Sequence, residues 1–370
     1  MKIGLLGFGV VGRGVYEIVQ AREDMSVGKV LCLEKIQLPD AEAVQDYSRI
    51  LEDDTIDTVV EAMGGLHPAY EFVRSALEAG KNVVTSNKAL VCTFYDQLVP
   101  LAEKMGVKFR STAAVGGGIG WLSELERSRR VQTITQVGGI MNGTCNYILD
   151  NMTRNGLDYS QALAQAQKLG YAEANPAMDV DGLDTWHKVI LSANIAFGVS
   201  LDKDTVPVMG IRNIQPEDVA RFQAHGLVCK LISTGRRQGD QVSAWVHPTL
   251  VPQGEPEAAV PMNYNLITFQ GETSQRMSFY GQGAGRYPTA YNVVQDLVDV
   301  AAGKGFYSPY GPKVAACNQD TMAYYVRGSW PEDQVAQDWQ GAVVTKPVSV
   351  SRMHAWVKEN PDAFVAEIRE

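Results

Sequence analysis

The sequence has few of the features that mark metal-binding or secreted proteins. Its five cysteines form no C-x-x-C pair and its five histidines show no H-x-x-x-H spacing, so the sequence predicts no metal site. Widely spaced, unpaired cysteines are typical of reduced thiols in the cytoplasm. The cysteines are Cys32, Cys92, Cys145, Cys229 and Cys317.

The chain also lacks long hydrophobic runs and a surplus of basic residues. No apolar stretch reaches membrane-spanning length, and Gly7, Arg13 and Glu17 interrupt the apolar N-terminus too early for a secretion signal. The net charge of −9 disfavours nucleic acid as a partner, because neutralising phosphates takes Lys and Arg. We therefore expect a cytoplasmic protein with no membrane or nucleic-acid partner.

What is present is an ordinary globular composition, 45% apolar and 20% charged, over 370 residues, which is long enough for two domains. In the first third, apolar strands alternate with helical periodicity over short connections. Strands are expected at 2–6, 29–33, 57–61, 81–85 and 107–110, and helices at 10–20, 68–79 and 95–105. This alternation predicts an α/β protein with an N-terminal Rossmann-type parallel sheet covered on both faces.

After about residue 130 the pattern changes. A strand at 132–138 and four helices, at 146–154, 160–169, 182–197 and 216–225, are followed by mostly strands. These strands are expected at 227–233, 241–247, 265–270 and 274–280, before a strong helix at 290–302. Such segregation predicts a second, α+β domain in which helices cover an open sheet.

A glycine-rich motif follows the first expected strand. Residues 7–12 read G-x-G-x-x-G and open the first expected helix. The first glycine permits a tight turn, the second lets the backbone approach a pyrophosphate, and the third lets helix and strand pack closely. Glycines kept only for packing are the alternative, but the motif's position favours a dinucleotide site. The predicted cofactor residues here are Gly7, Phe8, Gly9, Val10, Val11 and Gly12.

The choice between NAD and NADP rests on the residues after the second strand. Glu34 lies about twenty residues beyond the third glycine, where a carboxylate accepts the ribose 2′-hydroxyl of NAD. Lys35 follows and could instead face a 2′-phosphate, and both charges could simply be solvated. Glu34 gives a slight preference for NAD.

Polar residues also follow the third and fourth expected strands. Ligands of open parallel sheets bind beyond the carboxyl ends of the strands, where Gly64, Ser86 and Lys88 are expected. Lys88 there can orient the cofactor or polarise a substrate oxygen. A surface lysine whose stem covers apolar atoms is the alternative.

An acidic stretch between residues 170 and 188 is the most unusual part of the sequence. Glu173, Asp179, Asp181 and Asp184 precede Lys188, and Asp181 is a plausible helix N-cap. Asp184 and Lys188 alone would be an ordinary i,i+4 ion pair worth about 0.2–0.5 kcal/mol. The apolar sequence around them instead suggests a site for a small cationic group, with a lysine that moves protons.

Together these motifs resemble the homoserine dehydrogenase family, in the family's order from residue 1 to about residue 325. The resemblance implies that the enzyme interconverts homoserine and aspartate 4-semialdehyde by hydride transfer with NAD(P), in threonine and methionine biosynthesis. The matching pieces are GFGVVG at 7–12, VVEAMGG at 59–65, VTSNKAL at 84–90, IMNGTCNYI at 140–148, GYAE at 170–173, DGLDTWHK at 181–188, GQGAG at 281–285 and PTA at 288–290.

The resemblance also implies roles for individual residues. Lys188 resembles the family's proton donor or relay, and Lys88 the lysine that touches cofactor and substrate. Catalytic residues would then be Lys188, Lys88, Asp184 and Glu173. The implied substrate-binding residues are Glu173, Asp179, Asp184, Tyr171 and Thr144, and Gly283 joins the cofactor residues. The resemblance further implies a homodimer, with the 116–120 region and the second-domain strands near the subunit contact.

The implied domains are a dinucleotide-binding domain at 1–130, a substrate and dimerisation domain at 131–287, a helix returning to the nucleotide domain at 288–325, and a tail at 326–370. The tail resembles a truncated regulatory domain that opens at 322–327, so feedback inhibition by threonine is not expected. Tail residues otherwise carry no clear pattern.

Several positions depart from the family. Thr112 and Gly120 stand where a glutamate and a proline usually flank a cation-binding loop, so a metal is not expected, although Val115 and Gly117 carbonyls could contribute. Asn175 replaces a common aspartate. Leu33 replaces an arginine that serves the NADP phosphate, which again favours NAD. A related reductase of another amino-acid aldehyde or keto acid, or a silent dinucleotide sensor, are the alternative functions.

Overall fold

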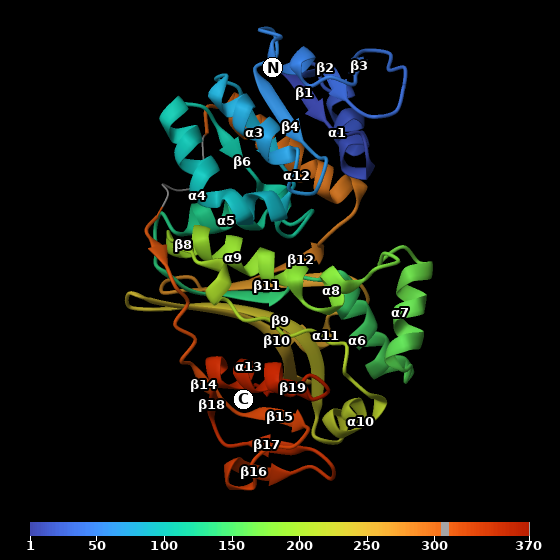
Figure 1. Ribbon diagram of the computed structural model, residues 1–370, viewed down its shortest axis with the longest axis vertical. Helices are drawn as coiled ribbons and strands as arrows, with labels where there is room; N and C mark the ends of the chain where they lie inside the picture. Colours follow the sequence, from blue (N-terminus) through green and yellow to red (C-terminus); the bar gives the residue numbers. More distant parts are fainter. Residues whose placement is uncertain (305–310, 370) are drawn as a thin grey trace. The chain divides into compact units, whose positions relative to one another are not determined.

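The computed structural model describes residues 1–304 and 311–369 and divides into two compact units. Unit 1 comprises residues 1–131, 194–200 and 282–312, and unit 2 comprises residues 132–193, 201–281 and 313–370. Each unit has its own large sheet, labelled in Figure 1. No helix in the described part of the chain is both long and apolar enough to cross a membrane.

Unit 1 is built on a six-stranded parallel sheet, in the order β3-β2-β1-β4-β5-β6 among the described residues. Leu6 at the end of β1 lies opposite Glu61 at the end of β4, and Glu61 lies opposite Thr85 of β5, so these carboxyl ends form one edge. The strands are β1 (Lys2–Leu6), β2 (Ser26–Leu31), β3 (Glu42–Val44), β4 (Thr58–Glu61), β5 (Asn82–Thr85) and β6 (Phe109–Arg110).

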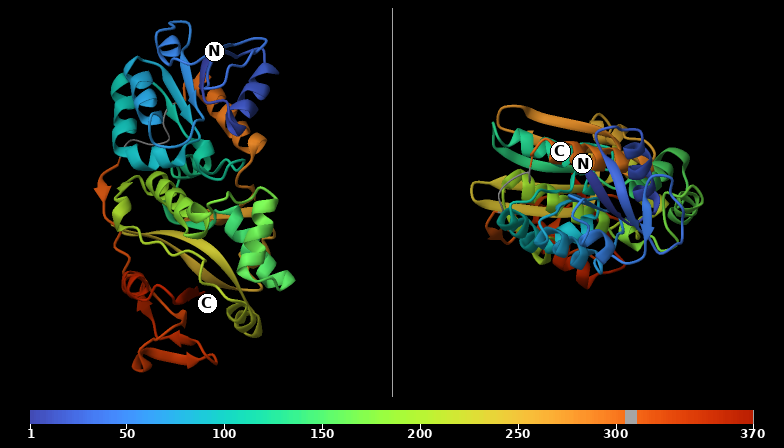
Figure 2. Two further views of the ribbon diagram at one scale, coloured as in Figure 1. Left: turned by 45° about the vertical axis from the view of Figure 1, so that its right-hand side comes forward. Right: turned by 90° about the horizontal axis from the view of Figure 1, so that it is seen from above.

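Helix α12 comes from late in the chain and packs on α1. Figure 2 shows the two helices side by side. Val15 and Val19 of α1 share a core with Val293 and Leu297 of α12. Gly14 permits the close approach, because a Cβ there would lie 2.9 Å from the Cβ of Ala290. The helices of unit 1 are α1 (Val10–Gln20), α2 (Ser48–Leu51), α3 (Ala69–Glu78), α4 (Lys88–Met105), α5 (Trp121–Ser128) and α12 (Arg286–Ala301).

Unit 2 contains a larger mixed sheet, in the order β12-β11-β7-β9-β10-β19-β15-β17-β16. Most neighbours are antiparallel, whereas β10 and β19 are parallel. The strands are β7 (Ile134–Ile140), β9 (Leu227–Gln238), β10 (Gln241–Pro252), β11 (Tyr264–Gly271), β12 (Gln275–Gln282), β15 (Tyr324–Arg327), β16 (Val335–Asp338), β17 (Val343–Thr345) and β19 (Phe364–Ile368). Short strands are β8 (Ser200–Leu201), β13 (Lys313–Val314), β14 (Thr321–Met322) and β18 (Val348–Ser349).

Helices pack on this sheet and carry most of the polar residues singled out above. Helix α6 contacts both β9 and β11, and α10 contacts β9. The remaining helices are α6 (Gly143–Asn155), α7 (Tyr159–Lys168), α8 (Ala177–Val180), α9 (Leu183–Phe197), α10 (Pro216–Ala224), α11 (Pro256–Ala259) and α13 (Val350–Glu359).

The structure confirms the predicted fold class and corrects some element limits. The expected strand at 29–33 starts and ends earlier, because β2 ends at Leu31 and Leu33 is 94% exposed. The helix expected at 95–105 is the part of α4 that follows a kink at Phe94, and α4 as a whole begins earlier, at Lys88. The Asn87 side chain caps that start by accepting from Leu90 N at 3.1 Å. The C-terminal residues without a clear pattern form β15 to β19 and α13 (Figure 1).

Candidate active site

The glycine loop of unit 1 has the geometry that a dinucleotide needs. Gly7 has φ +93°, and a Cβ at Gly12 would lie 2.1 Å from the carbonyl oxygen of Gly7. These two glycines are therefore required by the fold itself. Gly9 differs, because a Cβ there would meet no atom within 4 Å, and it is exposed beside Val10 at the start of α1. The open backbone and the helix N-terminus fit a pyrophosphate.

A buried glutamate shapes the neighbouring loop. Glu61 at the end of β4 accepts from Thr85 Oγ1 at 2.5 Å and from the backbone N–H groups of Met63 at 2.8 Å and Gly64 at 3.2 Å. The Asn87 amide donates to the Gly65 carbonyl at 2.7 Å. The predicted residues Gly64, Ser86 and Lys88 therefore follow adjacent parallel strands at the edge that also bears the glycine loop.

The predicted ribose carboxylate lies after β2. Glu34 is largely exposed and pairs with Arg13 Nη2 at 3.8 Å. The Arg13 guanidinium in turn lies 5.2 Å from the ring centroid of Phe8 in the glycine loop, and its Nε donates to the Phe8 carbonyl at 3.0 Å. Sequence reasoning missed Arg13, although its position directly after Gly12 was the available signal.

Gly283 approaches the loop that follows β6. A Cβ at Gly117 would lie 2.6 Å from the carbonyl carbon of Gly283, so only glycine permits this approach. The Gly117 carbonyl accepts a hydrogen bond from Asn292 Nδ2 at 2.5 Å. The Gly117 carbonyl, one of the two that could contribute to a cation site, thus accepts a hydrogen bond from the protein.

Thr112 belongs to a buried polar network rather than to an ion site. It donates through its backbone N–H and its hydroxyl to the carboxylate of Asp296, at 2.7 and 2.6 Å. Burial raises the pKa of Asp296, while Arg110 Nε, 3.0 Å away, favours its charged form. The charge of Asp296 is thus balanced within this network. The described residues contain no cluster of three or more His, Cys, Asp and Glu side chains that could hold a metal.

In unit 2 the acidic stretch folds into a compact cluster. Asn142, the N-cap of α6, donates through Nδ2 to Asp179 Oδ1 at 2.7 Å and to Asp184 Oδ2 at 2.9 Å. One amide thereby holds carboxylates from two different helices, α8 and α9. The sequence contained Asn142 within a matching motif, but nothing in its local pattern indicated this contact.

Lys188 completes the cluster. Its Nζ lies 2.7 Å from Asp184 Oδ2 and donates to the Met141 carbonyl at 2.6 Å. The side chains of Lys188 and Asp184 are only 9% and 10% exposed, so this is not an ordinary surface i,i+4 pair. A buried ammonium between a carboxylate and a carbonyl is suited to proton transfer.

Burial sets the acid–base properties of the cluster. It raises the pKa of Asp179, and the adjacent charge of Asp184 raises it further. Burial likewise raises the pKa of Cys145, whose Sγ lies 3.1 Å from the Asp179 carbonyl oxygen. Burial and the neighbouring carboxylate thus both disfavour the charged form of Asp179.

The other predicted substrate residues lie around the turn between α7 and α8. The Thr144 hydroxyl donates to the Tyr171 carbonyl at 2.6 Å, which ties the start of α6 to this turn. The Tyr171 ring lies 5.2 Å from that of Tyr147. Glu173 is exposed on the same turn, and its carbonyl accepts from Gln167 Nε2 at 3.1 Å. This contact involves the backbone of Glu173 and not its carboxylate.

The expected N-cap role of Asp181 is wrong. Asp181 has helical angles and is the C-terminal cap of α8, while α9 starts two residues later at Leu183. Its carboxylate forms a bidentate ion pair with Arg212, with a distance of 3.0 Å between Nη2 and Oδ2. The ion pair with Arg212, which lies far along the chain, thus outweighs the local preference of Asp181 for an N-cap position.

A parallel sheet with a dinucleotide loop, joined in one chain to a unit with a buried lysine–carboxylate cluster, defines a nicotinamide-dependent oxidoreductase. Comparisons give the family. Residues 7–111 match the NAD-binding domain of homoserine dehydrogenase, and residues 121–298 match the homoserine dehydrogenase catalytic family.

Curated relatives agree. The chain is 36% identical to homoserine dehydrogenase of Bacillus subtilis over 314 residues, which is 81% of this chain and 72% of the relative. It is 39% identical to the Corynebacterium glutamicum enzyme over 320 residues, 82% of this chain and 72% of the relative. The crystal structure of a homoserine dehydrogenase from Thiobacillus denitrificans superposes with a TM-score of 0.86 at 27% identity, covering 100% of this chain and 98% of that one.

The chain belongs to the homoserine dehydrogenase family. It is an NAD(P)-dependent oxidoreductase of amino-acid biosynthesis that acts on a small amino-acid substrate.

Proposed function

We propose that Lys188 exchanges the proton of the substrate oxygen, while Asp179 and Asp184 hold the substrate's α-ammonium group. In the reductive direction, Lys188 Nζ donates a proton to the aldehyde oxygen of aspartate 4-semialdehyde as a hydride adds to the aldehyde carbon. The C=O bond becomes the C–OH bond of homoserine. NAD(P)H, when bound, supplies the hydride.

The observation that carries this assignment is the buried contact of Lys188 with Asp184 and the Met141 carbonyl. Both contacts fix the Nζ atom, so it can meet a substrate oxygen without searching rotamers. Asp179 supports the ammonium role, because a buried carboxylate with a raised pKa gains from a cationic partner. Glu173, Tyr171 and Thr144 would border the bound substrate on the adjoining turn.

We propose that the cofactor is held by the loop from Gly7 to Gly12 and by Gly64, Ser86, Lys88 and Gly283. NAD is favoured, because Glu34 offers a carboxylate for a ribose hydroxyl. Arg13 beside it is the group that would serve a 2′-phosphate, and a hyperthermophilic archaeal homoserine dehydrogenase has been solved with NADPH. Lys88, at the start of α4, would contact cofactor and substrate together.

We further propose a cytoplasmic homodimer. Strand β12 is the edge of the nine-stranded sheet and exposes Met277 (41%) and Tyr280 (54%), the latter stacked on Tyr264 at 5.1 Å. An exposed apolar edge strand is a natural surface for a second copy. The five cysteines are free thiols, as in reducing compartments. Sedimentation of the purified protein would report the oligomeric state.

The test of the proposed function is a steady-state assay of nicotinamide absorbance. Homoserine should be oxidised faster than other hydroxy amino acids, with NAD preferred to NADP. Rates should be the same with and without sodium or potassium, because Thr112 stands where the family usually has a glutamate. Absence of turnover with either cofactor, at both neutral and alkaline pH, would contradict the proposal.

A further inference from the structure

The end of the chain forms a small module within unit 2. Residues 321–369, here called the C-terminal module, place strands in the order β19-β15-β17-β16, with α13 between β17 and β19. The connection from β15 to β16 contains only a short 3-10 turn at Glu332–Gln334, where a repeated strand–helix–strand pattern would place a second helix.

The side chain of Met209 belongs to the apolar core of this module. The apolar core of the module consists of Tyr324, Val326, Trp330, Val348, Met353 and Val365, with Met209 as the member from outside residues 321–369. Met209 is 8% exposed. Trp330, from the short β15–β16 connection, packs edge-on against Trp356 of α13 at 5.1 Å. The core of the module is thus completed by a residue of the preceding chain.

Met209 belongs to a short segment, residues 208–213, here called the strap. Its backbone is hydrogen-bonded on two sides: Met209 N donates to the Val246 carbonyl of β10, and Ile211 N donates to the Val180 carbonyl of α8, each at 2.8 Å. Only Gly210 separates the anchor Met209 from Ile211, which contacts α8. Such a short connection restricts how far Ile211 can move when Met209 is held in the core.

The strap lies directly against the turn that carries the substrate carboxylates. A Cβ at Gly210 would lie 2.0 Å from the Val180 carbonyl oxygen and 2.5 Å from the Cα of Asp181, so the two backbones touch. A Cβ at Gly182, where φ is +83°, would lie 2.9 Å from Val208. This turn joins Asp179 on α8 to Asp184 on α9. The strap contacts it at Val180 and Asp181 through Gly210, and at Gly182 through Val208.

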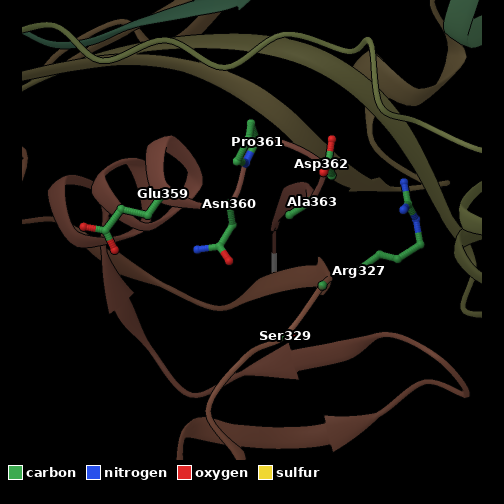
Figure 3. Close-up of a pocket in the computed structure, with 8 residues that line it drawn as sticks. Arg327, Ser329, Glu359, Asn360, Pro361, Asp362 and Ala363 are labelled. Atoms are coloured by element: carbon green, nitrogen blue, oxygen red, sulfur yellow. The ribbon is translucent and has the colours of Figure 1, made fainter.

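The far end of the strap is tied to the module as well. Asn213 Nδ2 donates to the carbonyls of Pro361 at 2.6 Å and Ala363 at 3.1 Å, in the loop between α13 and β19. Arg327 of β15 donates to the Asn213 carbonyl and to the fully buried carboxylate of Asp218. Figure 3 shows Arg327, Pro361 and Ala363 around one pocket beside this junction.

We propose that the C-terminal module positions the substrate carboxylates through the strap, with Met209 as its anchor. A densely packed core has a few discrete side-chain arrangements and does not deform continuously. The position of the Met209 side chain in the core therefore determines where Gly210 and Ile211 contact the α8–α9 turn. Displacement of Asp179 by a fraction of an ångström weakens its grip on an ammonium group. The inference rests on the proposed role of Asp179 and Asp184, and Met209 is a positioning residue that does not touch substrate.

Met209→Ala tests this role in the full-length enzyme. We expect the KM for homoserine to rise roughly three- to tenfold, with kcat and the KM for the dinucleotide within about twofold of wild type. Met209→Leu, which refills the core, should restore most of the affinity. Val343→Ala is the matched control, because Val343 packs on the same core from β17 and is not part of the strap. It should lower Tm without raising the KM for homoserine.

Asn213→Ala, at a half-buried residue outside the core of the module, provides a second variant should the core variant fold poorly. It removes both bonds to the 361–363 loop and should also raise the KM for homoserine, by about twofold or more. An unchanged KM in this variant and in any folded Met209→Ala enzyme would overturn the inference. So would an equal rise in the Val343→Ala control.

Asp179→Asn, measured in the same series, distinguishes failure of the positioning role of the strap from failure of the proposed substrate role of Asp179. If Asp179→Asn raises the KM and the strap variants do not, the positioning role fails and the proposed function stands. If Asp179→Asn leaves the KM unchanged, the substrate role of Asp179 itself is wrong.

Discussion

The glycine loop of unit 1 and the carboxylate cluster of unit 2 are suited to their ligands through different parts of the chain. The loop offers backbone: Gly9 is open, and α1 begins at the next residue. The cluster offers side chains: Asp179, Asp184 and Lys188 are held by an amide and a carbonyl from the β7–α6 connection. The first arrangement costs little charge burial, whereas the second keeps charges together away from water.

This difference teaches where each site is vulnerable. A backbone site fails when atoms are added to it, and a buried-charge site fails when charges are removed from it. Substitutions in the two regions should therefore change different kinetic constants.

The largest effect should come from Lys188→Ala. If Lys188 has the proposed proton-transfer role, its loss should lower kcat by about 10²–10⁴-fold. Dinucleotide affinity should stay at the wild-type value, because Lys188 pairs with Asp184 in unit 2 and not with the glycine loop. Stopped-flow or steady-state kinetics and dinucleotide titration measure the two quantities. Lys203→Ala, at a partly exposed lysine paired with Asp204, is the control and should be silent. Equal losses in kcat and in dinucleotide affinity would contradict the prediction that the glycine loop and the carboxylate cluster affect different kinetic constants.

The next effect should come from Gly9→Ala. A Cβ at Gly9 meets no protein atom within 4 Å, so Tm should not change, yet the methyl group would occupy the approach of the pyrophosphate. We expect dinucleotide affinity to fall roughly tenfold and the KM for homoserine to stay constant. Gly254→Ala, also without close neighbours, is the matched control. Unchanged dinucleotide affinity would mean that the loop is open for another reason.

Asp179→Asn should weaken function and strengthen the fold. Homoserine KM should rise by about tenfold or more, because an ammonium partner is lost. The folded pKa of Asp179 is raised by burial and Asp184, so its ionisation costs stability at pH above that pKa. The variant should therefore have the higher Tm at pH 7, and the gap should shrink as the pH falls below the raised pKa. Thermal melts from pH 4 to 8 would show it. A variant with a lower Tm at pH 7 would contradict the burial argument.

Glu34→Gln should give the smallest effect. Glu34 is 78% exposed, so the loss of its charge should change the NAD-to-NADP preference by only a few-fold, in favour of NADP. Competitive assays with both dinucleotides measure the ratio. Arg13→Gln should move the ratio the opposite way. If both variants leave the ratio unchanged, the preference is set elsewhere.

How far the sequence could predict the molecule follows from the range of the interactions involved. The strand β1, the helix α1 and the loop between them were predictable, because their pattern lies within twenty consecutive residues. The i,i+4 spacing of Asp184 and Lys188 was predictable for the same reason. That Asn142 joins Asp179 to Asp184 was not, since it depends on how α6 packs beside α8 and α9.

The C-terminal module shows the same limit more strongly. Its strands are two to five residues long, and their place in the sheet depends on β10, which lies far away in sequence. The pairing of Asp181 with Arg212 overrode a capping preference that was reasonable locally. In both cases tertiary contacts decided what local propensity could not.

The most direct test of the buried cluster is the single-turnover rate of Lys188→Ala with saturating homoserine and NAD, measured with increasing methylamine. If Lys188 moves the substrate proton, the variant should be slow by orders of magnitude, and its rate should rise with the concentration of the added amine. A single-turnover rate equal to that of the wild-type enzyme, without any amine, would contradict the role proposed for Lys188.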